Sequence, residues 1–141
     1  MYRNILAAYD GSEPAKRALA AAVRLTETFG GQLKVIHVFS LAGFPFGEAF
    51  MPLPQNVVKD LYAMAERVIE EARSQIRSLP YAEAVLQQGV PARAILEFAE
   101  QAGSDLIVVG SRGLGGIRGM VLGSVSHNVV QNAKVPVLVV K

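Results

Sequence analysis

Residues 105–130 read DLIVVGSRGLGGIRGMVLGSVSHNVV and carry the pattern that decides the fold. The stretch opens with a short segment that is apolar throughout after Asp105, as expected of a strand covered on both faces of a parallel sheet. A glycine-rich stretch follows at 110–123, and a helix is predicted over 124–133. A buried strand, a turn and a helix in this order are typical of α/β proteins.

The same alternation of strands and helices extends to both ends of the chain. The predicted strands are 3–9, 32–39, 82–88, 105–109 and 135–140. The predicted helices are 13–28, 56–79, 91–102 and 124–133. This order predicts a three-layer α/β/α, Rossmann-like fold in which helices cover both faces of a five-stranded parallel sheet. Ligands of such sheets bind beyond the carboxyl ends of the strands, which directs attention to the turns after strands one, two and four.

More specific structural predictions are possible for two segments of the chain. Residues 40–55 match no regular element and are rich in Phe and Pro; they form either a lid, a contact surface or a packed connector. In the helix at 56–79, apolar residues at steps of three and four predict the buried face. This face comprises Val57, Leu61, Met64, Val68, Ala72 and Ile76. The Met and Tyr residues of this helix are interpreted as core.

Length and composition predict one domain over residues 1–141. A chain of 141 residues, 51% of them hydrophobic and 18% charged, has the size of an ordinary domain and can bury a full core. Its longest charge-free runs, 35–47 and 119–133, are shorter than the roughly 18–20 apolar residues of a membrane span. No membrane insertion is therefore expected. Because no signal-peptide pattern opens the chain, the expected location is cytoplasmic.

Charge and residue usage exclude several classes of function. The net charge is only +2, and no cluster of Lys and Arg indicates binding to nucleic acid. The absence of cysteine excludes disulfides, thiolate metal sites and a cysteine nucleophile. His37 and His127 lie far apart without nearby ligand-type partners, so no metal site is expected. His37 is interpreted as a packed or hydrogen-bonded sheet residue, and His127 as an exposed helix residue.

The glycine-rich stretch favours a phosphate ligand. Glycines let the backbone approach a ligand closely, and a helix beginning at Ser124 offers free N–H groups and a favourable dipole to an anion. Residues 110–141 contain no Asp or Glu, whereas Arg112 and Arg118 lie in the loop. The Lys-Ser/Thr pair of a Walker motif is missing. A flexible connector followed by an ordinary serine cap is the alternative.

The whole chain resembles the universal stress protein family, a small α/β family related to the adenine-nucleotide α-hydrolase-like superfamily. The specific mark is the pattern Gly-x2-Gly-x9-Gly-Ser/Thr, matched here by Gly110, Gly113, Gly123 and Ser124. The segments RNILAAYDGSE at the start and KVPVLVV at the end are also similar to the family. In the family, this pattern marks the ATP-binding branch. The resemblance therefore implies strand order 3-2-1-4-5 and ATP as the ligand.

The resemblance also implies roles for individual residues. Asp10 would contact the nucleotide, with Ala8 and Tyr9 shaping the wall, although Asp10 also suits a turn cap before the helix. Tyr9 replaces the small or aliphatic residue common there. The backbone of Val38 would face adenine. Further candidate residues come from the fourth strand and the glycine-rich stretch: Val109, Gly110, Arg112 and Gly113 near ribose and phosphates, and Gly123, Ser124, Val125 and Ser126 around the phosphates.

Three functions remain open at this point. The first is an ATP-binding module of stress response or signalling, with Mg or Mn bound through the phosphates as an option. The second is a slow ATPase or nucleotide-activating enzyme, although no catalytic residue or metal cage is visible. The third is an interaction protein with an empty pocket. Strand 135–140 is apolar and is placed at a sheet edge by the family pattern, which predicts a homodimer through this strand; a protein partner beyond that is unknown.

Overall fold

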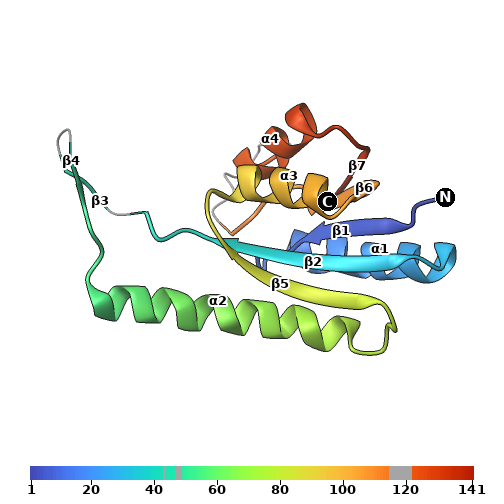
Figure 1. Ribbon diagram of the computed structural model, residues 1–141, viewed down its shortest axis with the longest axis horizontal. Helices are drawn as coiled ribbons and strands as arrows, with labels where there is room; N and C mark the ends of the chain where they lie inside the picture. Colours follow the sequence, from blue (N-terminus) through green and yellow to red (C-terminus); the bar gives the residue numbers. More distant parts are fainter. Residues whose placement is uncertain (43, 47–48, 115–121) are drawn as a thin grey trace.

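The computed structural model describes residues 1–42, 44–46, 49–114 and 122–141 (Figure 1). Its main sheet comprises β1 (Asn4–Ala8), β2 (Gln32–Phe39), β5 (Ala82–Gln88), β6 (Leu106–Gly110) and β7 (Val137–Val140). These five strands lie in the order β5-β2-β1-β6-β7, and each neighbouring pair is parallel. Numbered along the chain, this is the predicted order 3-2-1-4-5.

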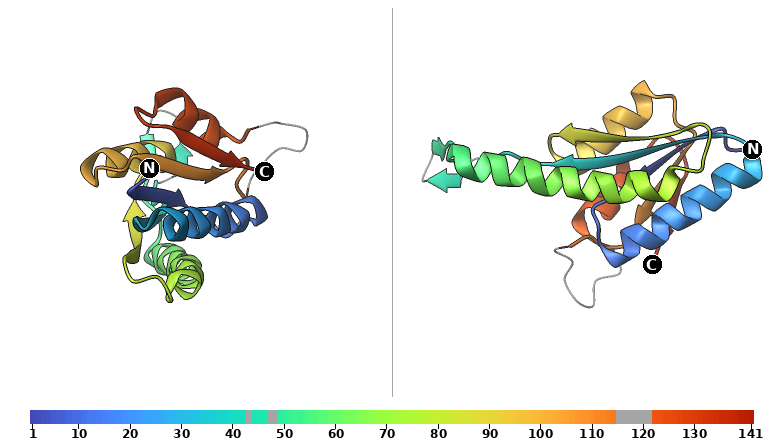
Figure 2. Two further views of the ribbon diagram at one scale, coloured as in Figure 1. Left: turned by 90° about the vertical axis from the view of Figure 1, so that its right-hand side faces the viewer. Right: turned by 90° about the horizontal axis from the view of Figure 1, so that it is seen from below.

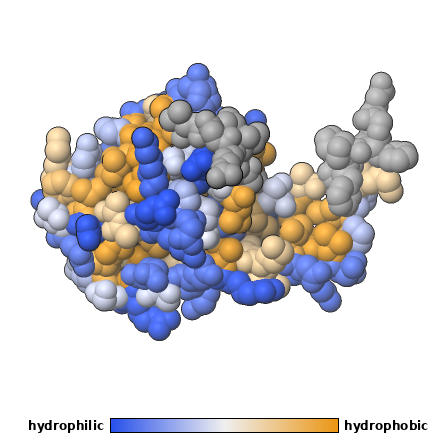
Figure 3. Space-filling view, turned by 180° about the vertical axis from the view of Figure 1, so that it is seen from behind, coloured by the Kyte–Doolittle hydropathy of each residue, from blue (hydrophilic) through white to orange (hydrophobic). Residues whose placement is uncertain are grey.

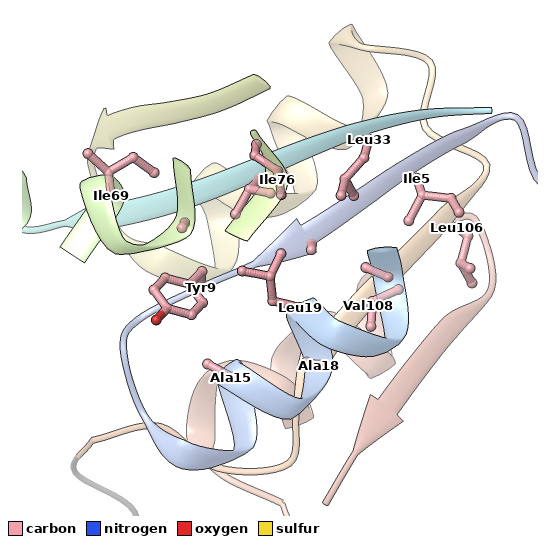
Figure 4. Packing of buried hydrophobic residues seen from close by; sticks show 14 residues of the cluster. Ile5, Tyr9, Ala15, Ala18, Leu19, Leu33, Ile69, Ile76, Leu106 and Val108 are labelled. Atoms are coloured by element: carbon pink, nitrogen blue, oxygen red, sulfur yellow. The ribbon is translucent and has the colours of Figure 1, made fainter. Parts of the chain in front are cut away.

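Helices cover both faces of this sheet (Figures 1 and 2). On one face, α1 (Glu13–Phe29) and α2 (Gln55–Ile76) pack on a buried cluster that includes Leu19, Leu33 and Ile69 (Figure 4). On the other face, α3 (Pro91–Gln101) and α4 (Ser124–Asn132) pack on a second cluster. Alternate side chains of the central strands β1 and β6 enter opposite clusters, so these two strands are almost entirely apolar. The predicted three-layer fold is confirmed.

The turn between β1 and α1 is fixed by local hydrogen bonds. The side chain of Ser12 caps α1 by accepting a hydrogen bond from the backbone N–H of Ala15 at 3.3 Å. Gly30 ends the helix in the left-handed conformation, with φ +64°. Both ends agree with the sequence, and the cap holds Asp10 at the carboxyl end of β1.

The buried face of α2 differs from the predicted one. The fully buried residues of this helix are Ala65, Ile69, Ala72 and Ile76. Met64 is 57% exposed and Tyr62 42% exposed, so the interpretation of these residues as core was wrong. The first half of α2 extends beyond the sheet (Figure 1), although the ring of Tyr62 still packs edge-to-face against Phe39 of β2, with centroids 5.0 Å apart. Ala65 is only 2% exposed, so the helix is packed at this level and Met64 lies on its exposed side. The helix also ends at Ile76 rather than at residue 79.

Residues 40–55 contain regular structure that was not predicted. The strands β3 (Phe44–Phe46) and β4 (Ala49–Met51) form a separate two-stranded antiparallel sheet. It lies beside the start of α2, away from the main sheet (Figure 1). Pro45 lies within β3, and proline is tolerated there because both strands of a two-stranded sheet are edge strands. Among the described residues, no helix combines the length and apolar character needed to cross a membrane.

Candidate functional site

A cavity of about 440 Å³ lies at the carboxyl ends of β1, β2 and β6. This volume lies within the range of small-molecule sites. All the predicted site residues line it: Ala8, Tyr9, Asp10, Val38, Val109, Gly110, Arg112, Gly113, Gly123, Ser124, Val125 and Ser126. Arg118 of the glycine-rich stretch lies outside the described residues. The structure thus brings together residues that are widely separated in the sequence, and their role in binding stays a prediction.

Asp10 joins two segments at the mouth of this cavity. Its Oδ1 accepts a hydrogen bond from the backbone N–H of Ser12 at 3.0 Å, which is the predicted turn cap. Its Oδ2 accepts a second hydrogen bond, at 3.2 Å, from the backbone N–H of Leu114. The Ser12 hydroxyl donates to the carbonyl of Arg112 at 3.4 Å. The turn after β1 is therefore tied to the segment after β6, more than a hundred residues later.

Two glycines of the sequence pattern are required by this close packing. A Cβ atom at Gly113 would lie 2.6 Å from Oδ2 of Asp10. A Cβ atom at Gly110 would lie 2.8 Å from the backbone nitrogen of Ala15, in the first turn of α1. The sequence suggested that these glycines let a ligand approach. The structure shows that they also let the segment after β6 approach the β1–α1 turn.

The first turn of α4 forms the polar end of the cavity. The helix begins at Ser124, and its first N–H groups have no acceptor within the helix. The helix dipole adds partial positive charge there, which makes this end a suitable anion site. Ser126 is buried, and its hydroxyl donates to the carbonyl of Ser111 at 2.8 Å. Because that hydroxyl proton already has an acceptor, the backbone N–H of Ser126 is the group that remains for a ligand.

Another part of the cavity lining is apolar and is called the apolar slot below. Ile36 and Val38 of β2, Ile95 of α3 and Val109 of β6 line it. Ile36, Ile95 and Val109 belong to the buried cluster between the sheet and the α3/α4 layer, and Val38 packs against this cluster. Ile36 is almost fully buried. An apolar slot of this kind suits a flat ring system. The cavity therefore combines a place for a ring with a place for an anion.

His37 also lines the cavity, and its imidazole is neutral around pH 7. Its Nδ1 lies 2.9 Å from the carbonyl oxygen of Tyr9, so Nδ1 carries the proton and donates it to that oxygen. Burial lowers the pKa of His37. This hydrogen bond and the charge of Asp10 act to raise the pKa, but the effect of burial is larger. The prediction of a hydrogen-bonded sheet histidine is confirmed. His127 is exposed on α4, as predicted.

Charged groups that could act chemically are few in the described part of the cavity. Among its lining residues, Asp10 is the one carboxylate and Arg112 the one guanidinium. No group of three or more His, Asp or Glu side chains that could hold a metal ion occurs in residues 1–42, 44–46, 49–114 and 122–141.

The sequence model of the Universal stress protein family matches residues 1–141. The chain belongs to this family. A universal stress protein of Thermus aquaticus is 41% identical over 141 residues, which span the whole of both chains. A universal stress protein of Bacillus subtilis is 37% identical over 151 aligned positions, again over the whole of both chains.

Solved structures of universal stress proteins share the fold. The protein UspA from Lactobacillus plantarum matches with a TM-score of 0.87 and 25% identity, over 99% of this chain and 98% of its own. A universal stress protein in complex with cAMP matches with a TM-score of 0.74 and 28% identity, over 99% and 97%. One from Archaeoglobus fulgidus in complex with dAMP matches with a TM-score of 0.69 and 28% identity, over 99% and 98%.

Some lining residues of this universal stress protein were not predicted. They are Ala15, Ile36, His37, Pro91, Ile95 and Leu114. The sequence predicted the ligand site at the turns after strands one, two and four. Pro91 and Ile95 instead follow β5, the third strand of the main sheet along the chain. Because β5 pairs with β2 in parallel, its carboxyl end meets the same edge of the sheet. The sequence Gly89-Val90-Pro91, a turn followed by a helix start, was the available signal.

Proposed function

We propose that this universal stress protein binds an adenine nucleotide, with ATP as the preferred ligand, and acts as a stress-response or signalling module in the cytoplasm. One observation carries the proposal: the same cavity is lined by an apolar slot and by the first turn of a helix. Two similar structures are universal stress proteins in complex with cAMP and with dAMP, which supports adenine as the base.

The residues of the cavity fit the parts of such a nucleotide. The slot at Ile36 and Val38 would take the adenine ring, which is flat and weakly polar. Asp10, which also lines the cavity, would face the ribose. The positive end of α4 and the Arg112 guanidinium would hold the phosphates. Because the described residues offer no carboxylate cluster, Mg²⁺ or Mn²⁺ would enter through the phosphates.

An enzyme, such as a slow ATPase or a nucleotide-activating transferase, is the alternative. Phosphoryl transfer requires a group that orients the nucleophile. Both carboxylate oxygens of Asp10 accept backbone N–H groups, which leaves this residue poorly placed to act as a base. Binding without rapid turnover therefore fits the site better. Steady hydrolysis above about 1 s⁻¹ that disappears in Asp10→Ala would favour the enzyme instead.

Titration calorimetry of the wild-type protein tests the proposal. We expect ATP to bind with a dissociation constant of about 1–10 µM, or about −7 to −8 kcal/mol. Inorganic triphosphate, which offers the phosphates without the base, should bind at least about tenfold more weakly because it leaves the apolar slot empty. Absence of ATP binding at millimolar concentration would contradict the proposal and would favour an interaction protein with an empty pocket.

A further inference from the structure

Tyr9 connects the cavity to the opposite side of the sheet. Its backbone N–H donates to the carbonyl of Ile36 at 2.9 Å, and its own carbonyl accepts the imidazole N–H of His37 at the same distance. Its ring is only 4% exposed and is buried in the cluster between the sheet and the layer formed by α1 and α2 (Figure 4). The main chain of this residue thus borders the cavity, while its side chain points away from it.

The hydroxyl of Tyr9 ends at a carboxylate on α2. It donates a hydrogen bond to Oε2 of Glu71 at 3.0 Å. Burial, together with the hydrogen bond and charge of Glu71, raises the pKa of Tyr9 to about 12, so the hydroxyl stays protonated and remains a donor around pH 7. The two residues lie 62 positions apart, and the bond joins the end of β1 to the second half of α2.

The same carboxylate lies directly behind the turn that carries Asp10. Gly11 has φ +84°, and a Cβ atom placed on it would lie 3.8 Å from Oε2 of Glu71 and 3.8 Å from a methyl group of Val68. The rear of the turn therefore contacts α2. Its front presents the Asp10 carboxylate, which accepts the N–H groups of Ser12 and Leu114.

We propose that Glu71 is a positioning residue for the cavity, which holds the Tyr9–Ser12 turn through the Tyr9 hydroxyl and thereby orients Asp10. The expected effect of Glu71 on nucleotide affinity rests on the proposed function. A positioning role and a purely electrostatic effect of Glu71 predict opposite changes in nucleotide affinity when its side chain is removed. Removing a negative charge would by itself favour an anionic ligand, whereas releasing the turn weakens the site because Asp10 loses its fixed orientation.

The test compares ATP affinity in Tyr9→Phe, Glu71→Ala, their double variant and Glu71→Gln. We expect Tyr9→Phe and Glu71→Ala to weaken binding by roughly three- to tenfold, the loss of about one hydrogen bond. The double variant should be no weaker than either single variant, because both remove the same bond. Glu71→Gln should stay close to wild type, because its amide oxygen can still accept the Tyr9 hydroxyl.

Two variants on the same helix serve as matched controls. Tyr62→Phe removes a hydroxyl that lies 3.5 Å from Oε1 of Gln88, away from the cavity. Glu66→Ala removes an equal charge from a carboxylate whose partner is Arg73, 4.0 Å away. Neither should change ATP affinity. Tighter or unchanged binding in folded Glu71→Ala, or an equal loss in Glu71→Gln and Glu71→Ala, would overturn the proposal.

A second measurement does not depend on nucleotide binding. The backbone amide resonances of Ser12 and Leu114, whose N–H groups both bond to Asp10, should shift in Tyr9→Phe and Glu71→Ala and stay in place in Tyr62→Phe. Unchanged resonances would overturn the positioning role even if ATP binds. Failure of the wild-type protein to bind ATP would contradict the proposed function alone, because the shifts of these two amides would still report the position of Asp10.

Discussion

Replacing Gly113 with valine is expected to weaken ATP binding by at least about 100-fold, or about 2.7 kcal/mol. A Cβ atom at this position would lie 2.6 Å from Oδ2 of Asp10, so the valine must displace either the carboxylate or the segment after β6. Either movement breaks the hydrogen bond from the Leu114 N–H to Asp10. Titration calorimetry gives the change in affinity.

A variant that loses stability without touching the cavity provides the control. Gly103 has φ +65° and nothing within 4 Å of an added Cβ atom, and it follows the end of α3. Gly103→Val should lower the melting temperature through backbone strain, yet keep the ATP affinity of the wild type. Gly113→Val should remain folded, since Gly113 is exposed. An unchanged ATP affinity in Gly113→Val would show that the proposed phosphate site is wrong.

The second large effect concerns assembly, which we propose occurs through β7. In the described sheet, β7 pairs with β6 on one side and lies at the edge on the other. The strand itself contains no charged residue that would discourage pairing, and the preceding Pro136 is acceptable at a strand start. A twofold dimer would let this edge pair with its own copy. We expect the wild-type protein to form such a homodimer.

Leu138→Lys should convert this dimer to a monomer. Leu138 lies in the middle of β7 and is 38% exposed, so a lysine there places two like charges near each other across the twofold contact. Light scattering should give 15.1 kDa for the variant and about twice that mass for the wild type. Met64→Lys, a matched change on α2 at a residue 57% exposed, should keep the dimer mass. A monomeric wild type at micromolar concentration, or a folded Leu138→Lys with the dimer mass, would contradict the proposal.

The main sheet and its helices could be predicted because their signals are local. The apolar runs, Ser12 as a cap and Gly30 as a stop all act within a few residues of each other. The buried face of α2 could not be predicted in the same way. Hydrophobic periodicity marks apolar positions but does not fix which of them face the sheet: Ala65 is 2% exposed, whereas the neighbouring Met64 is 57% exposed.

In the site too, local sequence patterns predict some features, whereas contacts between distant segments could not be predicted. The glycine pattern, together with the resemblance to the universal stress protein family, was sufficient to name residues that line the cavity. They could not show that Asp10 holds the N–H of Leu114, nor that Tyr9 reaches Glu71. These contacts join segments that are distant in the sequence, and the folded sheet alone decides which of them meet.

The hydropathy of the visible surface does not by itself show where a ligand binds (Figure 3). In Figure 3, hydrophobic and hydrophilic residues alternate over most of the visible face, so apolar area alone does not single out one site there. The cavity differs because its apolar slot adjoins the start of α4. A ligand with both a base and phosphates should therefore perturb this region and leave the outer surface of α2 unchanged.

An amide-resolved NMR titration of the wild-type protein with ATP tests this central claim most directly. We expect saturable shifts, fitting one dissociation constant of about 1–10 µM, for the backbone amides of Val38, Gly113 and residues 124–126. The amides of residues 60–64 on α2 should not move. Absence of shifts at saturating ATP, or shifts confined to residues outside the cavity, would contradict adenine-nucleotide binding at this site.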